Sequence, residues 1–389
     1  MSYRSNSYLE GQIKRYLEIG LTESQQKDLK EFVSLLEVSG RKPGTVKSIV
    51  FQLNKFAQLV GKDFRSVTKQ DIVKALSEVQ KHWKPSTVDN LKSRIKQFIR
   101  WLYSGNLEGD YPKVVSWIRC YNKMKHIPFT NGDDLFTDQE LEKMLRYCNG
   151  SMRRAFLMTI WESGCRIGEI LNMNFESVSF DHYGCVIYVD GKTGPRRVRL
   201  AKASPYLQVW LNNHPNRFKG SPLWIVRYRG TWRRWSYTGA QYFLCHRLPK
   251  MAGVRRRNIH MFRHSRMTYL AKHLTEAELN VYAGWTQGSR MSRRYVHLSG
   301  RDLDNKLLAL SGIKEKPVDE LKQILKPLIC GRCSKANPGD AKYCYRCGLI
   351  LTDKGLKEAI AKQSSLDRLS ILMDDDEKFK KLLHVLSNI

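Results

Sequence analysis

Seven side chains between residues 166 and 295 have the types and spacing to bind an anion, transfer protons and attack as a nucleophile. They are Arg166, Glu169, Lys192, His260, Arg263, Trp285 and Tyr295. Guanidinium groups bind anions bidentately and stay charged at any working pH, amines and imidazoles transfer protons, and a phenol can form a covalent intermediate. Each residue alone would equally suit an ordinary ion pair, a solvated turn or a packed aromatic ring. Their order along the chain therefore carries the information.

The net charge of the chain favours a polyanionic partner. The 389 residues include 67 lysines and arginines against 37 aspartates and glutamates, a formal charge of +30. A basic excess of this size binds nucleic acid through phosphate neutralisation and counterion release. A generally basic surface is the alternative. Aromatic residues make up 11% of the chain and the charge is not confined to a tail, so the composition favours nucleic acid.

The order of the seven residues follows a known pattern. They lie in "ESGCRIGEILNM" (162–173), "DGKTGP" (190–195), "HMFRHS" (260–265) and "GWTQGSRMSRRYVHLS" (284–299). Arg-x-x-Glu, a hairpin lysine, His-x-x-Arg, Gly-Trp and then tyrosine resemble the tyrosine recombinase (phage integrase) family, over about residues 24–300. The last two stretches are most similar to integrases of archaea and archaeal viruses.

The resemblance implies a covalent mechanism on DNA. Tyr295 is expected to attack a phosphodiester, forming a 3′-phosphotyrosyl link and leaving a free 5′-hydroxyl. The pentavalent transition state carries extra negative charge, and the resemblance assigns Arg166 and Arg263 to its non-bridging oxygens. The covalent link conserves the phosphodiester energy, so cleavage and rejoining are expected to need neither ATP nor a metal ion.

Four further residues take supporting parts by the same resemblance. Lys192 is expected to protonate the leaving 5′-oxygen, since the pKa of a lysine falls readily near other cations. His260 either accepts the proton of the nucleophile or hydrogen-bonds the phosphate. Trp285 offers one N–H donor and an apolar body that can pack against the site. Glu169 is expected to support Arg166 rather than to contact DNA.

Hydrophobic periodicity predicts a mainly α-helical protein with a small antiparallel β-sheet. Apolar residues recur at helical spacing over 24–105, and the period changes to that of a β-hairpin over 184–201. The resemblance makes the first region a helical core-binding (SAM-like) domain and residues 133–315 an α+β catalytic domain. Residues 1–23 are an N-terminal segment, and the turn-rich residues 106–132 are a predicted linker.

Two groups of basic residues are candidate DNA contacts. They are Lys92, Lys96 and Arg100 on the outward face of the fourth predicted helix, and Arg255, Arg256 and Arg257 just before the His-x-x-Arg motif. A solvated helix face is the alternative for the first group. In a chain this basic, the two interpretations of that face stay open.

Four late cysteines predict a metal site. Cys330, Cys333, Cys344 and Cys347 form two Cys-x-x-Cys knuckles, a spacing that supplies four thiolates to one structural Zn²⁺. Residues 328–350 are therefore a predicted zinc ribbon, whose partner is nucleic acid or protein. A pair of disulfides or a redox pair is the alternative. The other five cysteines are scattered, which suits a reducing compartment.

The chain ends in a predicted helical tail, residues 353–389. Its last part, "DDDEKFKKLLHVLSNI" (374–389), has acids at its start and apolar residues on one face. That face packs either on its own chain or on a neighbour. Family members commonly assemble as four protomers linked through a C-terminal segment, and by resemblance this tail or the helix expected at 302–311 is that segment.

Together these features predict a site-specific DNA recombinase, of the integrase, excisionase or resolvase type. Double-stranded DNA is the expected partner, bound by a dimer per site and a tetramer in the synapse. A type IB topoisomerase-like enzyme and a non-catalytic zinc-containing DNA-binding regulator are the rivals; the two-domain layout and the complete residue set favour the recombinase. The start of the chain has no signal-peptide core and no apolar run approaches about 20 residues, so a cytoplasmic or nucleoid-associated protein without a membrane partner is expected.

Overall fold

The computed structural model describes residues 6–120, 134–191, 193–286 and 326–373, with residues 288, 289, 291, 292, 295 and 311. Lys192, most of 302–311 and the tail 374–389 lie outside the described residues. The chain divides into two compact units, Met1–Pro128 and Phe129–Ile389. The division falls inside the segment that the sequence predicts as a linker.

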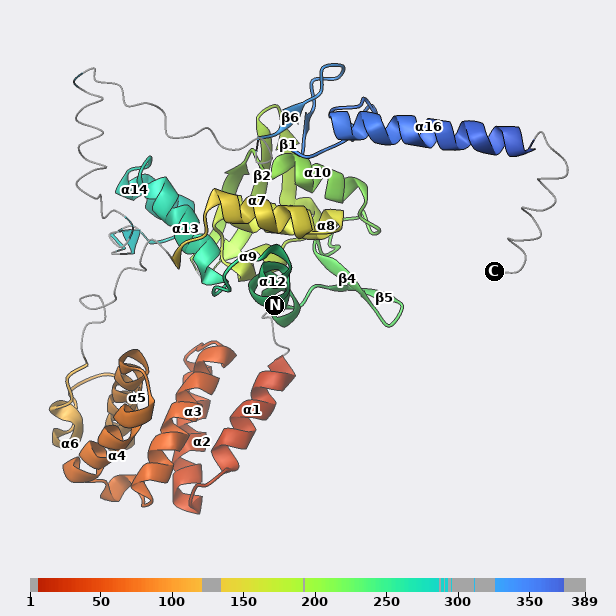
Figure 1. The fold of residues 1–389 in the computed structure, drawn as a ribbon. Helices are drawn as coiled ribbons and strands as arrows, with labels where there is room; N and C mark the ends of the chain where they lie inside the picture. The colour runs from red at the N-terminus through yellow and green to blue at the C-terminus, as the bar shows by residue number, and fades with distance from the viewer. Residues whose placement is uncertain are drawn as a thin grey trace. The chain divides into compact units, whose positions relative to one another are not determined.

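The first unit is a helical bundle (Figure 1). Its elements are α1 (Asn6–Glu18), α2 (Glu23–Val38), α3 (Pro43–Val60), the 3-10 turn η1 (Phe64–Ser66), α4 (Lys69–His82), α5 (Pro85–Ser104) and the one-turn α6 (Lys113–Ser116). Local signals set the helix ends. Thr22 and Thr68 form capping boxes at the starts of α2 and α4. Gly61 and Gly105 end α3 and α5 in the left-handed conformation that glycine adopts without strain.

Aromatic rings fill the core of this bundle. Phe32, Phe64 and Phe98 are fully buried, and Phe98 packs edge-on against the other two rings at 5.2 and 4.7 Å. Helix α1 adds Ile13 and Leu17 to the same core. The N-terminal segment thus contains a packed helix, which the sequence interpretation had not separated from the preceding residues.

The second unit contains the residues predicted to do chemistry. In chain order its first elements are α7 (Asp138–Tyr147), α8 (Ser151–Ser163), α9 (Ile167–Leu171), the 3-10 turn η4 (Phe175–Ser177), β1 (Val178–Asp181), β2 (Gly184–Gly191), β3 (Gly194–Leu200) and α10 (Ser204–Asn212). They are followed by β4 (Ile225–Tyr228), β5 (Thr231–Arg234), α11 (Tyr237–Tyr242), the π-helical turn η5 (Phe243–Arg247), α12 (Leu248–Ala252), α13 (His260–Ala271) and α14 (Glu276–Ala283).

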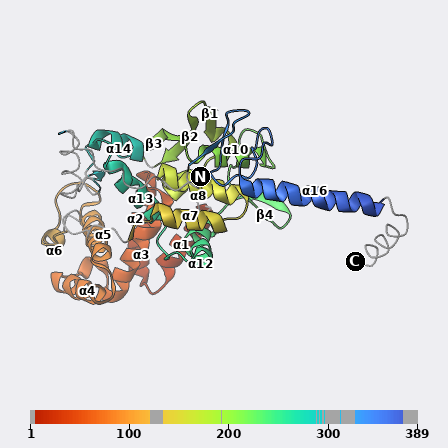
Figure 2. The ribbon, with the colours of Figure 1, turned by 45° about the horizontal axis from the view of Figure 1, so that its top comes forward.

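A three-stranded antiparallel sheet, in the order β1-β2-β3, supports the site. Strands β2 and β3 pair from Cys185 opposite Leu200 to Gly191 opposite Gly194, which confirms the hairpin predicted over 184–201. Helices α8 and α10 pack against each other and beside this sheet (Figure 1, Figure 2). The hairpin tip therefore has a fixed base, although the lysine at the tip is not among the described residues.

A buried tryptophan fixes the helix that follows Arg166. Trp224 is fully buried, and its indole N–H donates to the carbonyl of Ile170 in α9 at 2.8 Å. Phe156 of α8 packs edge-on against the same ring at 5.0 Å. These contacts hold the α8–α9 corner, where Arg166 lies, against the main core of the unit.

The last described elements are β6 (Leu328–Ile329), β7 (Ala336–Asn337) and α16 (Asp353–Met373). The two strands pair antiparallel, and the Tyr343 hydroxyl donates to the carbonyl of Gly355 in α16 at 3.0 Å. Asp340 forms an ion pair with Arg154 of α8. No helix among the described residues is long and apolar enough to cross a membrane.

Candidate active site

A buried carboxylate holds two guanidinium groups at the start of α9. Glu169 is 4% exposed; its Oε1 accepts from Arg166 at 2.8 Å and its Oε2 accepts from Arg196 at 2.7 Å. The backbone N–H of Arg166 also donates to Oε2 at 3.0 Å. Burial raises the pKa of Glu169, but hydrogen bonds and charge from Arg196 and Arg166 outweigh it and lower the pKa. Two cations around one anion leave this cluster positive.

Arg196 is a site residue that the sequence interpretation missed. It lies on β3, its Nε donates to the carbonyl of Tyr282 at 3.2 Å, and its side chain is 10% exposed. It therefore ties the hairpin to both Glu169 and α14. A signal was present, because β3 carries a double arginine four and five residues after Lys192. An alternating strand must turn one of the two inward.

Arg263 lies buried beside the same corner. It is 7% exposed, and its two terminal nitrogens donate to the carbonyls of Gly164 at 2.9 Å and Ala283 at 2.7 Å. Its guanidinium is 5.3 Å from the ring centroid of Trp285. Burial and the charge of Arg166 lower the pKa of Arg263 to about 10, so it stays protonated at neutral pH. Three of its five N–H groups remain for another acceptor.

The hairpin tip and His260 border this pair of arginines. Thr193, beside Lys192, donates its hydroxyl to the carbonyl of Gly284 at 2.8 Å. On the other side of the tip, a Cβ on Gly191 would meet Oε1 of Glu169 at 2.5 Å, so a larger residue there would displace the carboxylate. His260 begins α13 with an exposed side chain. Loss of hydration, and then the charges of Arg263 and Arg166, lower the pKa of His260.

Tyr295 is buried between elements of the second unit, at 7% exposure. Its ring stacks on Trp285 at 5.6 Å with an interplanar angle of 10°. Its hydroxyl lies 2.7 Å from Nδ1 of His264. The histidine on the phenol is thus the residue after Arg263, and not His260, which lies one turn earlier on α13. The signal available in the sequence was the four-residue spacing of His260 and His264, which puts both on one helix face.

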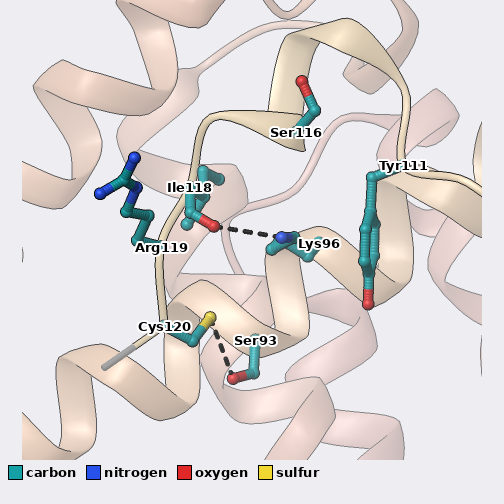
Figure 3. A pocket seen from close by; sticks show the side chains of 7 residues that line it. All are labelled: Ser93, Lys96, Tyr111, Ser116, Ile118, Arg119 and Cys120. Atoms are coloured by element: carbon teal, nitrogen blue, oxygen red, sulfur yellow. Dashed lines mark hydrogen bonds between the residues drawn. The ribbon is translucent and has the colours of Figure 1, made fainter. Parts of the chain in front are cut away.

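The three predicted DNA contacts on α5 each contact a nearby residue of their own unit. Lys96 and Arg100 donate to the carbonyls of Ile118 and Gly109 at 3.1 and 2.9 Å, and Lys92 lies 3.6 Å from a carboxylate one turn earlier. Figure 3 shows the hollow of about 680 Å³ beside Lys96. Carbonyl partners carry no formal charge, so Lys96 and Arg100 remain cations that can still attract phosphate.

The three consecutive arginines before α13 have different surroundings in the structure. Arg257 points at α7, pairs with Glu140 at 2.8 Å and has 8% of its side chain exposed. This ion pair neutralises the charge of Arg257 in a packed position, so of the three arginines it is the one held most firmly within its own unit. Arg255 pairs with Asp134 at 3.2 Å at the surface, and Arg256 is exposed.

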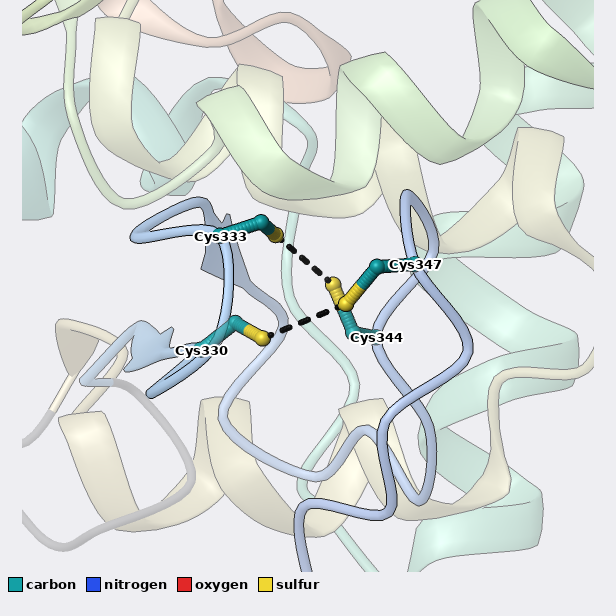
Figure 4. Close-up of side chains that lie close together, drawn as sticks. All are labelled: Cys330, Cys333, Cys344 and Cys347. Carbon is teal, nitrogen blue, oxygen red and sulfur yellow. Dashed lines mark hydrogen bonds between the residues drawn. The ribbon is translucent and has the colours of Figure 1, made fainter.

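The four late cysteines meet in one cluster (Figure 4). All four Sγ atoms lie within 4.8 Å of one another, with pairs at 3.5 Å (Cys330–Cys347) and 3.6 Å (Cys333–Cys344). Tetrahedral metal–sulfur bonds of about 2.3 Å would put the sulfurs about 3.8 Å apart, so the cluster fits a four-thiolate metal site. Burial raises the pKa of Cys344, but backbone N–H donors in its knuckle outweigh it and lower the pKa to about 6.

Comparison with known proteins accounts for this geometry. Residues 135–301, which contain all seven predicted site residues, match the phage integrase family. The match covers less than half of the chain, and it shows that this region is similar to the phage integrase family. Tyrosine recombinase XerA of Pyrococcus horikoshii is 24% identical over 196 residues, 49% of this chain and 63% of that protein. The match therefore leaves more than a third of that relative unaligned.

Solved structures of a site-specific recombinase and of an integrase share the fold. A post-cleavage complex of the XerH site-specific recombinase with its palindromic difH substrate is 19% identical, with a TM-score of 0.53, over 80% of this chain and 98% of that one. A lambda integrase tetramer bound to a Holliday junction is 13% identical, with a TM-score of 0.53, over 79% and 83%. The predicted fold class, a mainly helical chain with a small antiparallel β-sheet, is confirmed.

Proposed function

We propose that this protein is a site-specific DNA recombinase that breaks and rejoins duplex DNA through a 3′-phosphotyrosyl link on Tyr295. The observation that carries the proposal is a single packed group. Trp285 stacks on Tyr295, lies over the guanidinium of Arg263, and so joins a phenol to an anion-binding corner. The similarity of residues 135–301 to the phage integrase family supports the same reaction class.

The two arginines stabilise the transition state in this proposal. Arg166 and Arg263 together present several free N–H donors, and Arg263 keeps its charge at neutral pH. They hold the non-bridging oxygens of a phosphorane bidentately. Glu169 and Arg196 keep Arg166 oriented, so they act as positioning residues.

Proton transfer completes the reaction. Lys192 protonates the leaving 5′-oxygen. Its two chain neighbours support a place for Lys192 near the arginines, because Gly191 lies against Glu169 and Thr193 donates to the carbonyl of Gly284. His260 hydrogen-bonds the phosphate. Loss of hydration, and then the charges of Arg263 and Arg166, lower the pKa of His260, so the neutral imidazole can donate one N–H. Neither role requires a metal ion or ATP.

Partners and cofactor follow from the same proposal. The protein binds double-stranded DNA as a dimer per site and a tetramer in the synapse, and the tail 374–389 is the candidate link between protomers. Cys330, Cys333, Cys344 and Cys347 hold one Zn²⁺, which cross-links the two knuckles and has no part in cleavage. The five cysteines outside this cluster form no disulfide, which supports a reducing, cytoplasmic setting.

A trapped-intermediate experiment tests the proposed activity. Incubated with a duplex nicked close to the cleavage position, the protein should accumulate a covalent DNA adduct, because the short strand diffuses away. The Tyr295→Phe variant should form no adduct and bind the duplex as tightly as the unaltered chain. A matched Tyr282→Phe variant, which alters a tyrosine hydrogen-bonded to the carbonyl of Glu162, should keep the adduct. An adduct of normal yield in Tyr295→Phe would exclude the proposal.

A further inference from the structure

The hydroxyl of Tyr295 is already in hydrogen-bond contact with a side chain to which no role has been assigned. Nδ1 of His264 lies 2.7 Å from that hydroxyl, and the two rings are 5.7 Å apart with an interplanar angle of 33°. His264 is half-buried on α13, directly after Arg263. The same helix thus carries an anion-binding residue and a residue on the phenol.

We infer that His264 is the proton acceptor for Tyr295, an inference that rests on the proposed function. When the phenol oxygen bonds to phosphorus and the bond from phosphorus to the 5′-oxygen breaks, the phenolic proton moves to Nδ1 of His264. The leaving 5′-oxygen takes its proton from Lys192. In rejoining, the 5′-hydroxyl attacks, the tyrosine leaves, and His264 returns the proton. No oxidant, metal or further reactant is needed.

The division of work between the two histidines follows from their surroundings. His260 is exposed and faces the charges of Arg263 and Arg166, a setting suited to a phosphate oxygen. His264 contacts the phenol itself, within the range of about 2.6–3.2 Å that general-base geometry demands. A purely structural role for His264, as a ring that packs under Tyr295, is the alternative to be excluded.

Two substitutions at His264 separate proton transfer from packing. In His264→Asn the amide oxygen can take the place of Nδ1 and accept a hydrogen bond, but it cannot take a proton. In His264→Ala both functions are lost. Single-turnover cleavage of the nicked duplex should slow in both variants by about 10²–10⁴-fold, the usual contribution of a general base. DNA binding should stay unchanged, which also shows that the variants are folded.

A chemical substitution at Tyr295 provides the second readout. A fluorinated tyrosine at position 295 has a more acidic phenol and needs the base less. It should restore much of the cleavage rate of His264→Asn while changing the unaltered chain little. The inference is overturned if His264→Asn cleaves within about threefold of the rate of the unaltered chain. It is also overturned if fluorination of Tyr295 restores none of the cleavage rate of His264→Asn, or if His264→Ala cleaves faster than His264→Asn. Absence of any adduct in the unaltered chain would instead refute the proposed function.

A separate observation concerns the β4–β5 hairpin. Residues 191–275 contain 19 lysines and arginines and no aspartate or glutamate. The hairpin lies in this segment and, in Figure 1, extends from the helices of its unit. Tyr228 and Trp232 are 51% and 47% exposed at its end, and the guanidiniums of Arg229 and Arg233 lie 5.5 and 5.4 Å from the Tyr228 ring.

The base of this hairpin is rigid. Arg234 donates to the carbonyls of Leu171 and Met173 at 2.8 and 2.9 Å and to the side chain of Asn174 at 2.6 Å. The hairpin is therefore anchored at the end of α9, the helix whose N-cap is Arg166. Within the described residues, none of Arg227, Arg229 and Arg233 forms an ion pair, so three guanidiniums project from a fixed base.

We propose that the β4–β5 hairpin is a second contact for duplex DNA and binds the phosphate backbone beside the cleaved site. A two-stranded ribbon fits a groove or spans a backbone, and guanidiniums bind phosphate bidentately. This proposal also rests on the proposed function, but it concerns affinity for flanking DNA and not cleavage.

The test is a titration on duplexes of increasing length. Arg227→Ala/Arg229→Ala/Arg233→Ala is compared with a control that removes the same charge elsewhere on this unit, Lys143→Ala/Arg146→Ala/Lys219→Ala. The hairpin variant should lose the gain in affinity that flanking DNA gives, and its salt-dependence slope should fall by about 2–3, near 0.9 per phosphate contact. Cleavage of a short nicked duplex should not change. The proposal is overturned if both variants bind duplexes of every length with the same affinity. It is also overturned if the hairpin variant binds every duplex as tightly as the unaltered chain and loses only a contact between protomers.

Discussion

Glu169→Gln is the most informative structural perturbation of this site. The carboxylate is 4% exposed and is the anion between Arg166 and Arg196. Removing one partner of a buried ion pair costs about 3–5 kcal/mol, because the remaining charge is left uncompensated. The amide of glutamine can keep one hydrogen bond to a guanidinium, worth about 1.5–3 kcal/mol. We therefore expect the free energy of unfolding of the second unit to fall by about 1–3 kcal/mol.

Calorimetry can resolve this loss, because the two units need not unfold together. For a domain of this size the loss corresponds to a fall in Tm of about 2–12 °C. Cleavage should slow as well, since Arg166 loses its orientation. Glu176→Gln is the matched control: Glu176 is exposed and accepts from the N–H of Gly220. Its effect should stay within about 0.5 kcal/mol.

The pH dependence of the stability difference between the unaltered chain and Glu169→Gln tests the role of the Glu169 charge independently. The pKa of Glu169 is lowered in the folded state from its ordinary value of 4.5. The stability that its charge contributes is therefore fully present above about pH 4.5 and is lost as the pH falls through the lower folded pKa. The gap in Tm between the unaltered chain and Glu169→Gln should narrow in acid. A gap no larger than that of Glu176→Gln at pH 7 would refute the role assigned to Glu169.

Three further outcomes follow from the site. Replacing Arg166 by alanine removes a positive charge facing His260, so the pKa of His260, followed by NMR, should rise. An unchanged pKa would show that the charge of Arg166 does not act on His260. Lys192→Ala should be partly rescued by a substrate with a better 5′ leaving group; equal defects on both substrates would argue against Lys192 as the acid. Metal analysis should find about one zinc per chain, lost in Cys344→Ser, while cleavage persists in chelator; cleavage that required added metal would contradict the mechanism.

Deleting residues 374–389 tests the proposed link between protomers. Binding to a single half-site should stay unchanged, because the tail is assigned no DNA contact. Cooperative filling of paired half-sites should weaken in gel-shift titrations, and recombination should fall more than single-strand cleavage. Unchanged cooperativity would assign the tail to its own chain.

The sequence predicted those parts of the site that local spacing determines. Arg166 and Glu169 are three residues apart at a helix start, and the hairpin residues alternate between a buried and an exposed face, so each pattern is complete within a few residues. The cysteine cluster was predictable for the same reason. Its four ligands lie in two short knuckles whose spacing alone matches tetrahedral thiolate coordination.

The contacts that the sequence interpretation missed join residues far apart in the chain. Arg196 meets Glu169 across 27 positions, and His264 meets Tyr295 across 31. Arg257 meets Glu140 across 117 positions, in an ion pair that the sequence did not predict. Which of several adjacent basic residues turns inward depends on the packing of helices and strands, and periodicity within a single element does not contain that information.

The central claim is that Tyr295 becomes covalently bonded to DNA. The most direct measurement is peptide mapping of the adduct trapped on a nicked duplex, with the DNA trimmed to a short nucleotide remnant. We expect a single modified peptide containing "YVHLSGR", with a phosphodiester from the Tyr295 hydroxyl to a 3′-phosphoryl end. The other end of the broken strand should carry a free 5′-hydroxyl. A remnant on another residue, or a link to a 5′-phosphoryl end, would contradict it.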